Sequence, residues 1–308
     1  MSTLSVGLED YLTLRRSLGY KLERAGEVLA DFVAFAEAAG TEHVRTEVAV
    51  AWALRAPNPD SRWRADRLGA VRSFARYLHA IDSVHEVPPS GLIPRGTGRP
   101  APYLYSKDQI SALMAAAHQL HSPLQAATLE TVIGLLAVSG LRVGEVIRLD
   151  NAEIDFDAAT LHVRNSKGGR SRVVPLDPSA LEPLGSYIAV RDRRFPRARS
   201  DSFFVSTVGQ RLRSGNLAFA FSIVVALAGL PTRRAGVGPN LGGFRHSFAV
   251  QTLLEWHRSG VDVAPLLPLL SSFLGHVNPA STYWYLSASP ELMAAAAGRL
   301  DLAFGGQS

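Results

Sequence analysis

The chain has 308 residues, of which 47% are hydrophobic, and its formal net charge is +5. This length and apolar content are sufficient for two domains with packed cores. The absence of cysteine excludes a disulfide framework and a thiolate metal site, and the scattered histidines suggest no metal. Among 32 lysine and arginine residues only Lys21, Lys107 and Lys167 are lysines, so arginine, which suits phosphate, carries the positive charge.

The N-terminus and the apolar stretches give no sign of export or of a membrane span. Glu9 and Asp10 precede any apolar run, so we expect no signal peptide. The longest uncharged stretch, residues 215–232, contains Asn216 and Pro231 and is better explained as a buried core helix than as a membrane helix. We therefore expect a cytoplasmic protein.

Residues 1–54 show apolar positions at helical spacing, with predicted breaks at Gly19 and Gly40. A further helix is predicted over residues 61–80, and its apolar side includes Phe74. The other side is rich in arginine, and we predict that these side chains lie along a DNA phosphate backbone: Arg62, Arg64, Arg67, Arg72 and Arg76. The alternative is a solvated basic face.

Residues 87–103 are rich in proline and glycine, which predicts an extended linker. The linker separates a first domain over residues 1–86 from a second domain over residues 104–308.

The second domain opens with Ser106 and Gln109 in the spacing of a capping box, which predicts the start of a helix. A second helix, from about residue 124, is predicted to end at Gly140. Arg142 follows in a short connection, where a backbone phosphate can approach its guanidinium group. Glu145 lies one helical turn further and could orient that group.

Residues 154–176 alternate short apolar runs with turns, which predicts β-strands. Lys167 falls in a Gly-rich turn between two of these runs, so we place it at the tip of a hairpin. The neighbouring Arg170 and Arg172 are predicted to contact DNA.

The chain then continues with a predicted helix over residues 181–190. Five arginines between residues 191 and 199 are as consistent with an exposed loop as with a DNA contact. A short strand is predicted over residues 203–206 and a core helix over residues 217–227. Arg245 lies near the start of the next predicted helix.

The C-terminal segment combines a histidine with two tyrosines. His276 ends an apolar run, and Asn278 with the following proline predicts the start of a new helix. Tyr285 lies about two turns into that helix. Tyr283 points to roughly the opposite face, so only one of the two tyrosines can face the arginines.

In chain order, five of these residues resemble the catalytic set of the tyrosine recombinases, the phage integrase family: Arg142, Lys167, Arg245, His276 and Tyr285. The match covers about two thirds of the chain closely, and the family's spacing from the Leu-Gly-His motif selects Tyr285 over Tyr283. Residues 248–288 most resemble integrases encoded by transposons.

The resemblance implies a mainly α fold with a small antiparallel β-sheet. A helical core-binding domain would clamp the duplex, and a mixed α/β catalytic domain would end in a tail helix over residues 291–304. Such tails dock on a neighbouring protomer, and packing within the same chain is equally open. The implied partners are double-stranded DNA recombination sites and further copies of the chain, as a tetramer on synapsed DNA. The reaction requires no metal and no other cofactor.

The residue types fit transesterification of a DNA phosphodiester. Two fixed arginines can neutralise the charge that develops on the non-bridging oxygens. The tyrosine attack would leave a 3'-phosphotyrosyl link and a free 5'-hydroxyl, and the family assigns Lys167 as the acid that protonates the leaving oxygen.

One position departs from the family's His-x-x-Arg motif, because Gly242 stands three residues before Arg245. The missing histidine assists proton transfer, a contribution typically worth about 10²- to 10⁴-fold in rate. His246 is a poor substitute, because adjacent helical residues point about 100° apart. We therefore predict slowed or lost cleavage with DNA binding intact.

Two alternatives follow from these residues. A DNA-binding accessory protein of a mobile element, disabled for catalysis, would explain Gly242. A type IB topoisomerase-like enzyme would share the chemistry without exchanging strands between partners.

Overall fold

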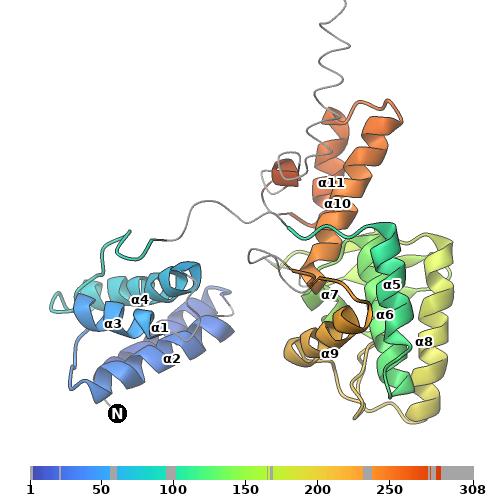
Figure 1. Cartoon of the computed structure of the whole chain (residues 1–308). Helices are drawn as coiled ribbons and strands as arrows, with labels where there is room; N and C mark the ends of the chain where they lie inside the picture. Colours follow the sequence, from blue (N-terminus) through green and yellow to red (C-terminus); the bar gives the residue numbers. More distant parts are fainter. Residues whose placement is uncertain are drawn as a thin grey trace, which may run out of the picture. The chain divides into compact units, whose positions relative to one another are not determined.

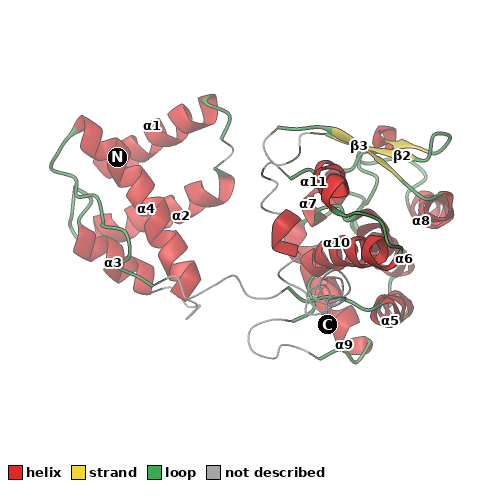
Figure 2. Ribbon diagram, turned by 90° about the horizontal axis from the view of Figure 1, so that it is seen from above, coloured by secondary structure: helices red, strands yellow, loops and turns green. Residues whose placement is uncertain are grey.

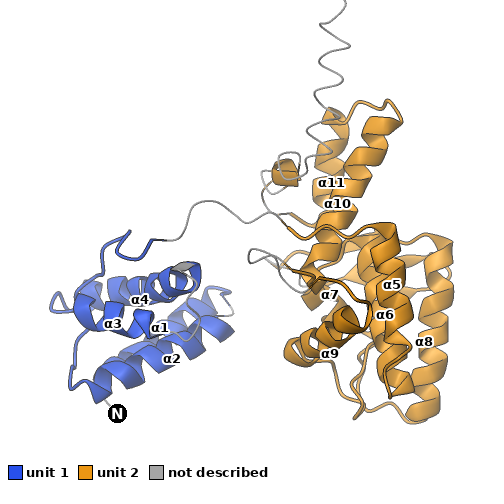
Figure 3. Cartoon of the chain, in the orientation of Figure 1, with its two compact units in different colours: residues 1–99 blue, residues 100–308 orange. Residues whose placement is uncertain are grey.

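The structure is a computed structural model that describes residues 3–20, 22–55, 61–94, 102–164, 166, 169–231, 238–276, 278 and 282–285. It is mainly helical with one small antiparallel sheet (Figure 1, Figure 2), which confirms the predicted fold class. The chain forms two compact units, residues 1–99 and 100–308 (Figure 3). Lys167 and the predicted tail helix over residues 291–304 lie outside the described residues.

The first unit packs its helices around one apolar core. The core includes Phe32 and Trp52, whose rings meet edge to face at 5.2 Å. The first two helices end just before the predicted breaks at Gly19 and Gly40. The helices are α1 (Thr3–Ser17), α2 (Glu23–Ala38), α3 (Thr46–Leu54) and α4 (Ser61–Ile81).

The proline-rich stretch that was predicted as a linker begins as part of this unit. Val87 and Ile93 pack against the same apolar core. Arg72 of α4 donates hydrogen bonds to the carbonyl groups of Pro88 and Pro89 at 2.7 and 2.8 Å. Apolar side chains on either side of the prolines thus attach the start of this stretch to the first unit.

The second unit is built around α6, which is buried along most of its length and contacts α5, α8 and α10. The capping box predicted at Ser106 and Gln109 is present at the start of α5. The helices are α5 (Lys107–Ala117), α6 (Pro123–Ser139), α7 (Val143–Arg148), α8 (Leu181–Arg194), α9 (Ser214–Leu227), α10 (Leu241–Arg258) and α11 (Leu267–Leu274). Short 3-10 turns occur at Asn151–Glu153, Pro178–Ala180 and Ala264–Leu266.

The sheet lies at one edge of the second unit (Figure 2) and has the strand order β1-β2-β3, with both pairs antiparallel. Its register places Leu161 opposite Val174, and both side chains enter the core. The segment over residues 203–206, predicted as a strand, makes only an isolated bridge from Val205 within the part that the structure describes. The strands are β1 (Ile154–Asp155), β2 (Thr160–Val163) and β3 (Arg172–Pro175).

Helix α9 is less buried than its composition predicts. One face enters the core through residues such as Leu217 and Phe221, but Phe219, Ile223 and Leu227 are exposed on the other. Apolar composition alone cannot predict which face of such a helix has a neighbour to pack on. In the described part of the chain, no helix is long and apolar enough to cross a membrane.

A separate apolar cluster joins the second half of α10 to α11. Leu253 of α10 and Leu270 and Leu274 of α11 are fully buried in it, together with Tyr285. Tyr285 belongs to a helical turn over residues 282–285. This packing fixes the end of α11 and the tyrosine against α10.

Candidate active site

Arg142 lies at the start of α7 because the chain turns sharply after α6. Gly140 ends α6 with a φ of +58°, and a Cβ at this position would lie 2.6 Å from the Phe248 ring, so only glycine fits. Arg142 is then the N-cap residue of α7, and its backbone N–H donates to the Glu145 carboxylate at 3.0 Å. The guanidinium group is therefore attached at a well-defined point of the backbone.

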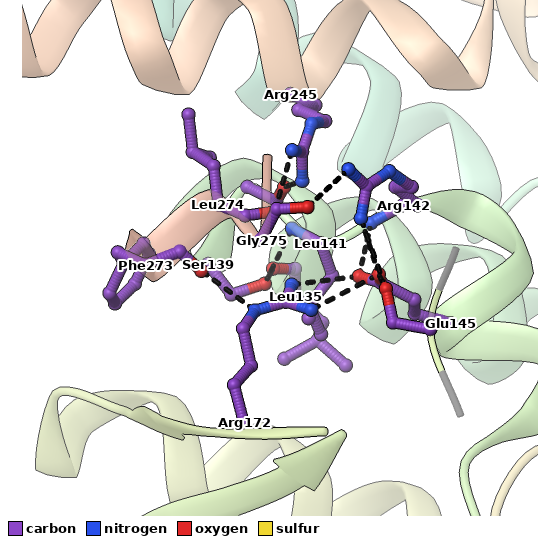
Figure 4. A network of polar contacts seen from close by, with 12 residues as sticks. Leu135, Ser139, Leu141, Arg142, Glu145, Arg172, Arg245, Phe273, Leu274 and Gly275 are labelled. Carbon is purple, nitrogen blue, oxygen red and sulfur yellow. Dashed lines mark hydrogen bonds and ion pairs between the residues drawn. The ribbon is translucent and has the colours of Figure 1, made fainter. Parts of the chain in front are cut away.

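Glu145 is a buried carboxylate that binds two arginines. One oxygen accepts from Arg142 Nη1 at 2.8 Å and from the Ser166 hydroxyl at 2.8 Å, and both oxygens accept from Arg172 at 3.1 and 2.9 Å (Figure 4). Burial alone would raise the pKa of Glu145, but the hydrogen bonds from Arg172, Arg142 and Ser166 lower this pKa to about 2. Glu145 is therefore ionised at neutral pH and orients Arg142, the contact expected from the sequence.

Arg172 belongs to β3, but its guanidinium group is turned into the protein. In addition to its two bonds to Glu145, it donates through Nε to the carbonyl group of Phe273 at 2.7 Å. Its side chain is only 12% exposed. The sequence predicted a DNA contact for Arg172, whereas the structure gives all three of its nitrogens protein acceptors.

Arg245 is buried one turn into α10 and is 7% exposed. Its Nη1 donates to the carbonyl group of Gly140 at 2.8 Å, and its Nη2 donates to that of Leu274 at 2.6 Å. Burial, followed by the nearby charge of Arg142, lowers the pKa of Arg245 to about 10. The guanidinium group therefore remains charged at neutral pH, although it lies beside another cation.

The end of α11 holds all three arginines through successive carbonyl groups. The carbonyl of Phe273 accepts from Arg172 at 2.7 Å, that of Leu274 from Arg245 at 2.6 Å, and that of Gly275 from Arg142 at 2.8 Å (Figure 4). A helix leaves its last carbonyls without helical partners, so they are available as acceptors. The backbone of residues 273–275, which includes the first two residues of the Leu-Gly-His motif, thus fixes the arginines relative to one another.

His276 and Tyr285 lie beside this cluster. The Nδ1 atom of His276 is 2.7 Å from the hydroxyl oxygen of Thr282, and its ring centre is 6.0 Å from that of Tyr285. Burial and the charges of Arg245, Arg142 and Arg172 lower the pKa of His276 to about 4. Tyr285 is 3% exposed and Tyr283 is 52% exposed, so the two tyrosines do face opposite ways.

His246 and Gly242 lie on the same helix, α10. The His246 ring lies 5.4 Å from the Tyr285 ring and 5.5 Å from the Trp284 ring, so it packs beside the tyrosine. Gly242 is exposed, and among the described residues a Cβ at this position would meet the Asn240 side chain alone, at 3.1 Å. The helix therefore has room for a side chain at this position if the Asn240 side chain shifts by a few tenths of an ångström.

The predicted DNA-contacting arginines of α4 differ in their surroundings. Arg67 stacks on Trp52 at 3.8 Å and pairs with Asp31 at 2.9 Å, and Arg72 is engaged by proline carbonyls. Arg62 and Arg64 are half-buried and Arg76 is exposed, as is Arg170 of the second unit. An exposed arginine is the better candidate for a phosphate contact.

Sequence reasoning missed several groups of this site. Ser166, Thr282 and the carbonyl groups of residues 273–275 contribute by hydrogen bonding alone, and nothing in their type or spacing indicates that role. Glu145 carried a signal, namely the Arg-x-x-Glu spacing of a capped helix start. Among the residues that the structure describes, no group of three His, Asp or Glu side chains is arranged to hold a metal ion.

The chain is similar to known proteins along most of its length. Residues 104–291 match the phage integrase family. A Sinorhizobium fredii protein named as an integrase/recombinase, y4rB, is 42% identical over 307 residues, 98% of each chain. The tyrosine recombinase XerD of Caulobacter vibrioides is 30% identical over 233 residues, which cover 75% of this chain and 72% of XerD.

Solved structures share the fold at low sequence identity. The Tn1549 transposon integrase in complex with transposon right end DNA has a TM-score of 0.68 at 14% identity, covering 98% of this chain and 99% of that one. A lambda integrase tetramer bound to a Holliday junction has a TM-score of 0.62 at 16% identity, covering 92% and 76% of the two chains. With its matched domain and these relatives, the chain belongs to the phage integrase family, the tyrosine recombinases.

Proposed function

We propose that this protein is a site-specific DNA recombinase that cleaves and rejoins strands through a 3'-phosphotyrosyl intermediate on Tyr285. One observation carries the proposal: the end of α11 fixes Arg142 and Arg245 through neighbouring carbonyl groups, and His276 and Tyr285 lie directly beside them. Two fixed cations, an imidazole and a buried phenol form a site for a phosphodiester.

The arginines would bind the non-bridging oxygens of the scissile phosphate. Within the described residues, the hydrogen bonds of Arg245 use two of the five N–H donors of a guanidinium group, so donors remain for a phosphate. Charge-assisted bonds of this kind strengthen as the oxygens gain charge in the transition state. Because Arg245 stays protonated at neutral pH, it can act in this way under cellular conditions.

In the cleavage step, the phenol of Tyr285 gives its proton to a water molecule in the space left by the missing imidazole at Gly242. Its oxygen bonds to phosphorus while the bond from phosphorus to the 5'-oxygen breaks. The 5'-oxygen takes up a proton, which we assign to Lys167 on the strength of the family resemblance. His276 is neutral above about pH 4. In the tautomer in which Nδ1 accepts from the Thr282 hydroxyl, Nε2 carries the hydrogen and would donate to a non-bridging oxygen.

Gly242 is expected to slow this reaction. The family's histidine at this position assists proton transfer, and that role is typically worth about 10²- to 10⁴-fold in rate. His246 lies beside Tyr285 but also packs against Trp284. We propose that cleavage is slowed and that DNA binding is retained.

We further propose that the substrate is double-stranded DNA, bound by both units in the cytoplasm without a cofactor. The unit over residues 1–99 would act as the core-binding domain and the second unit as the catalytic domain. Synapsis of two sites would require a tetramer. The fold shared with a lambda integrase tetramer on a Holliday junction and with a transposon integrase on transposon DNA supports this proposal.

The test is a cleavage assay on nicked DNA duplexes, scored as SDS-resistant protein–DNA adducts. The duplexes carry the end sequences of the mobile DNA element in which the gene for this protein would lie. We expect the wild type to form an adduct, Tyr285→Phe to abolish it, and the matched control Tyr283→Phe to retain it. Gly242→His should form the adduct faster than the wild type. If neither the wild type nor Gly242→His forms an adduct on DNA that both bind, the protein is not a recombinase.

A further inference from the structure

We propose that Arg172 is a positioning residue of the cleavage reaction and does not contact DNA phosphate. This inference rests on the proposed function and adds a residue to its site. The side chain starts on β3 and bridges two other segments, because it binds Glu145 of α7 through two nitrogens and the carbonyl group of Phe273 in α11 through the third. A single guanidinium group thus ties together the sheet, α7 and α11.

Arg172 contacts the partners of Arg142 on both sides. Glu145, which accepts from Arg142 Nη1 at 2.8 Å, also accepts from Arg172. Gly275, whose carbonyl group accepts from Arg142 Nη2 at 2.8 Å, lies against the Arg172 guanidinium group. A Cβ on Gly275 would come within 2.8 Å of Arg172 Nη1, so this glycine is required for the contact as well as for its φ of +67°.

The charges explain why a second arginine is needed at this place. A buried carboxylate with one partner removed is strongly destabilising, because its desolvation is no longer compensated. Without Arg172, Glu145 would keep only Arg142 as a charged partner, beside the Ser166 hydroxyl, and the end of α11 would lose one of its links to the sheet. Arg142, Arg245 and His276 would then move relative to one another.

The geometry also explains why the residue is an arginine. Its planar fork reaches both oxygens of Glu145 while Nε reaches Phe273, and a lysine ammonium cannot make the same three contacts from one rigid group. Ser166, which precedes Lys167 in the chain, also donates to Glu145 at 2.8 Å, so the hairpin that begins with β2 meets the same carboxylate. Arg172 therefore acts where the hairpin joins the arginine cluster.

The first experiment separates positioning from DNA contact. DNA affinity is measured between low and moderate salt for the wild type, for Arg172→Met and for Arg170→Met, whose exposed arginine is two residues away. The slope of log K against log salt is negative, and the loss of one phosphate contact reduces its magnitude by about one. We expect the wild-type slope for Arg172→Met and a less steep slope for the Arg170→Met control. A slope whose magnitude is reduced by about one in Arg172→Met would overturn the inference.

The second experiment measures single-turnover cleavage at saturating DNA, in the wild-type or the Gly242→His background, whichever forms more adduct. A misplaced reacting group costs about 100-fold in rate. We expect the rate constant to fall by about this factor in Arg172→Met, with little recovery in Arg172→Lys. A purely structural role would lower the amplitude, which reports the folded fraction, and leave the rate constant unchanged.

The outcomes for the inference and for the proposed function are distinct. If the parent background forms an adduct and Arg172→Met leaves the rate constant unchanged, only the positioning role is contradicted. The absence of any adduct in both parent backgrounds overturns the proposed function, and the positioning role falls with it. A slowed rate constant at unchanged DNA affinity supports both.

Discussion

The Glu145→Gln substitution tests the buried charge cluster most directly. Glu145 has a pKa of about 2 in the folded protein, compared with an ordinary value of 4.5. This difference corresponds to about 3 kcal/mol of folding free energy at neutral pH, at 1.36 kcal/mol for each tenfold change in proton affinity. Breaking a buried ion pair costs about 3–5 kcal/mol in other proteins, so the two lines of reasoning agree.

The pH dependence of the effect has a definite sign. Because the pKa of Glu145 is lowered on folding, its contribution to stability is fully present above about pH 5 and is lost as the pH falls toward 2. At pH 3 less than half of the contribution should remain. The wild type should therefore exceed Glu145→Gln in stability by about 3 kcal/mol at pH 7, and this difference should narrow in acid.

The assay must report on the second unit alone, because the chain contains two compact units. Urea-dependent hydrogen exchange, followed by mass spectrometry on peptides from α6 and α10, meets this need. Glu255→Gln, an exposed change on α10, is the matched control and should leave stability nearly unchanged. If Glu145→Gln matches the wild type at pH 7, or if the difference persists undiminished at pH 3, the argument from the buried carboxylate is wrong.

Two further predictions concern α10 and the histidine. Gly243→Ala should lower stability by about 1–3 kcal/mol, because its Cβ would lie 2.8 Å from the carbonyl oxygen of Tyr103. Gly242→Ala should cost less, because among the described residues its Cβ meets only the Asn240 side chain, at 3.1 Å, and a side chain can shift more easily than a backbone carbonyl. Thermal unfolding of both variants checks this, and equal melting temperatures would contradict it. His276 should titrate near pH 4 in the free protein, so its contribution to stability is present above about pH 6.5 and is lost as the pH falls toward 4. An NMR titration measures this value, and an imidazole that is half protonated near pH 6.5 would refute it.

Much of the chain's organisation follows from local sequence. The helix start at Ser106 depends on side-chain to backbone bonds within three residues, and the end of α6 depends on a glycine that can adopt a positive φ. The order of Arg142, Arg245, His276 and Tyr285 identified the family. That identification needs only the types of these residues and their order along the chain, so it requires no knowledge of which segments are in contact.

The roles of individual arginines were not accessible in this way. Arg142 and Arg172 both bind Glu145, yet the sequence suggested that Arg172 contacts DNA. Likewise, Arg67 and Arg72 lie on a helix whose composition predicts a phosphate-binding face, and the structure places them against Trp52 and proline carbonyl groups. The same guanidinium chemistry serves either purpose, and only the neighbours decide.

The sequence by itself determined several helix ends, the family and the candidate nucleophile, because these depend on residue type and on spacing along the chain. Only the tertiary structure showed that three consecutive carbonyl groups at the end of α11 hold Arg172, Arg245 and Arg142. Backbone carbonyls are identical in every residue, so no residue pattern predicts which of them will accept a bond. These contacts join segments up to 133 positions apart, and only packing of α10 against α6 and of α11 against α10 brings those segments together.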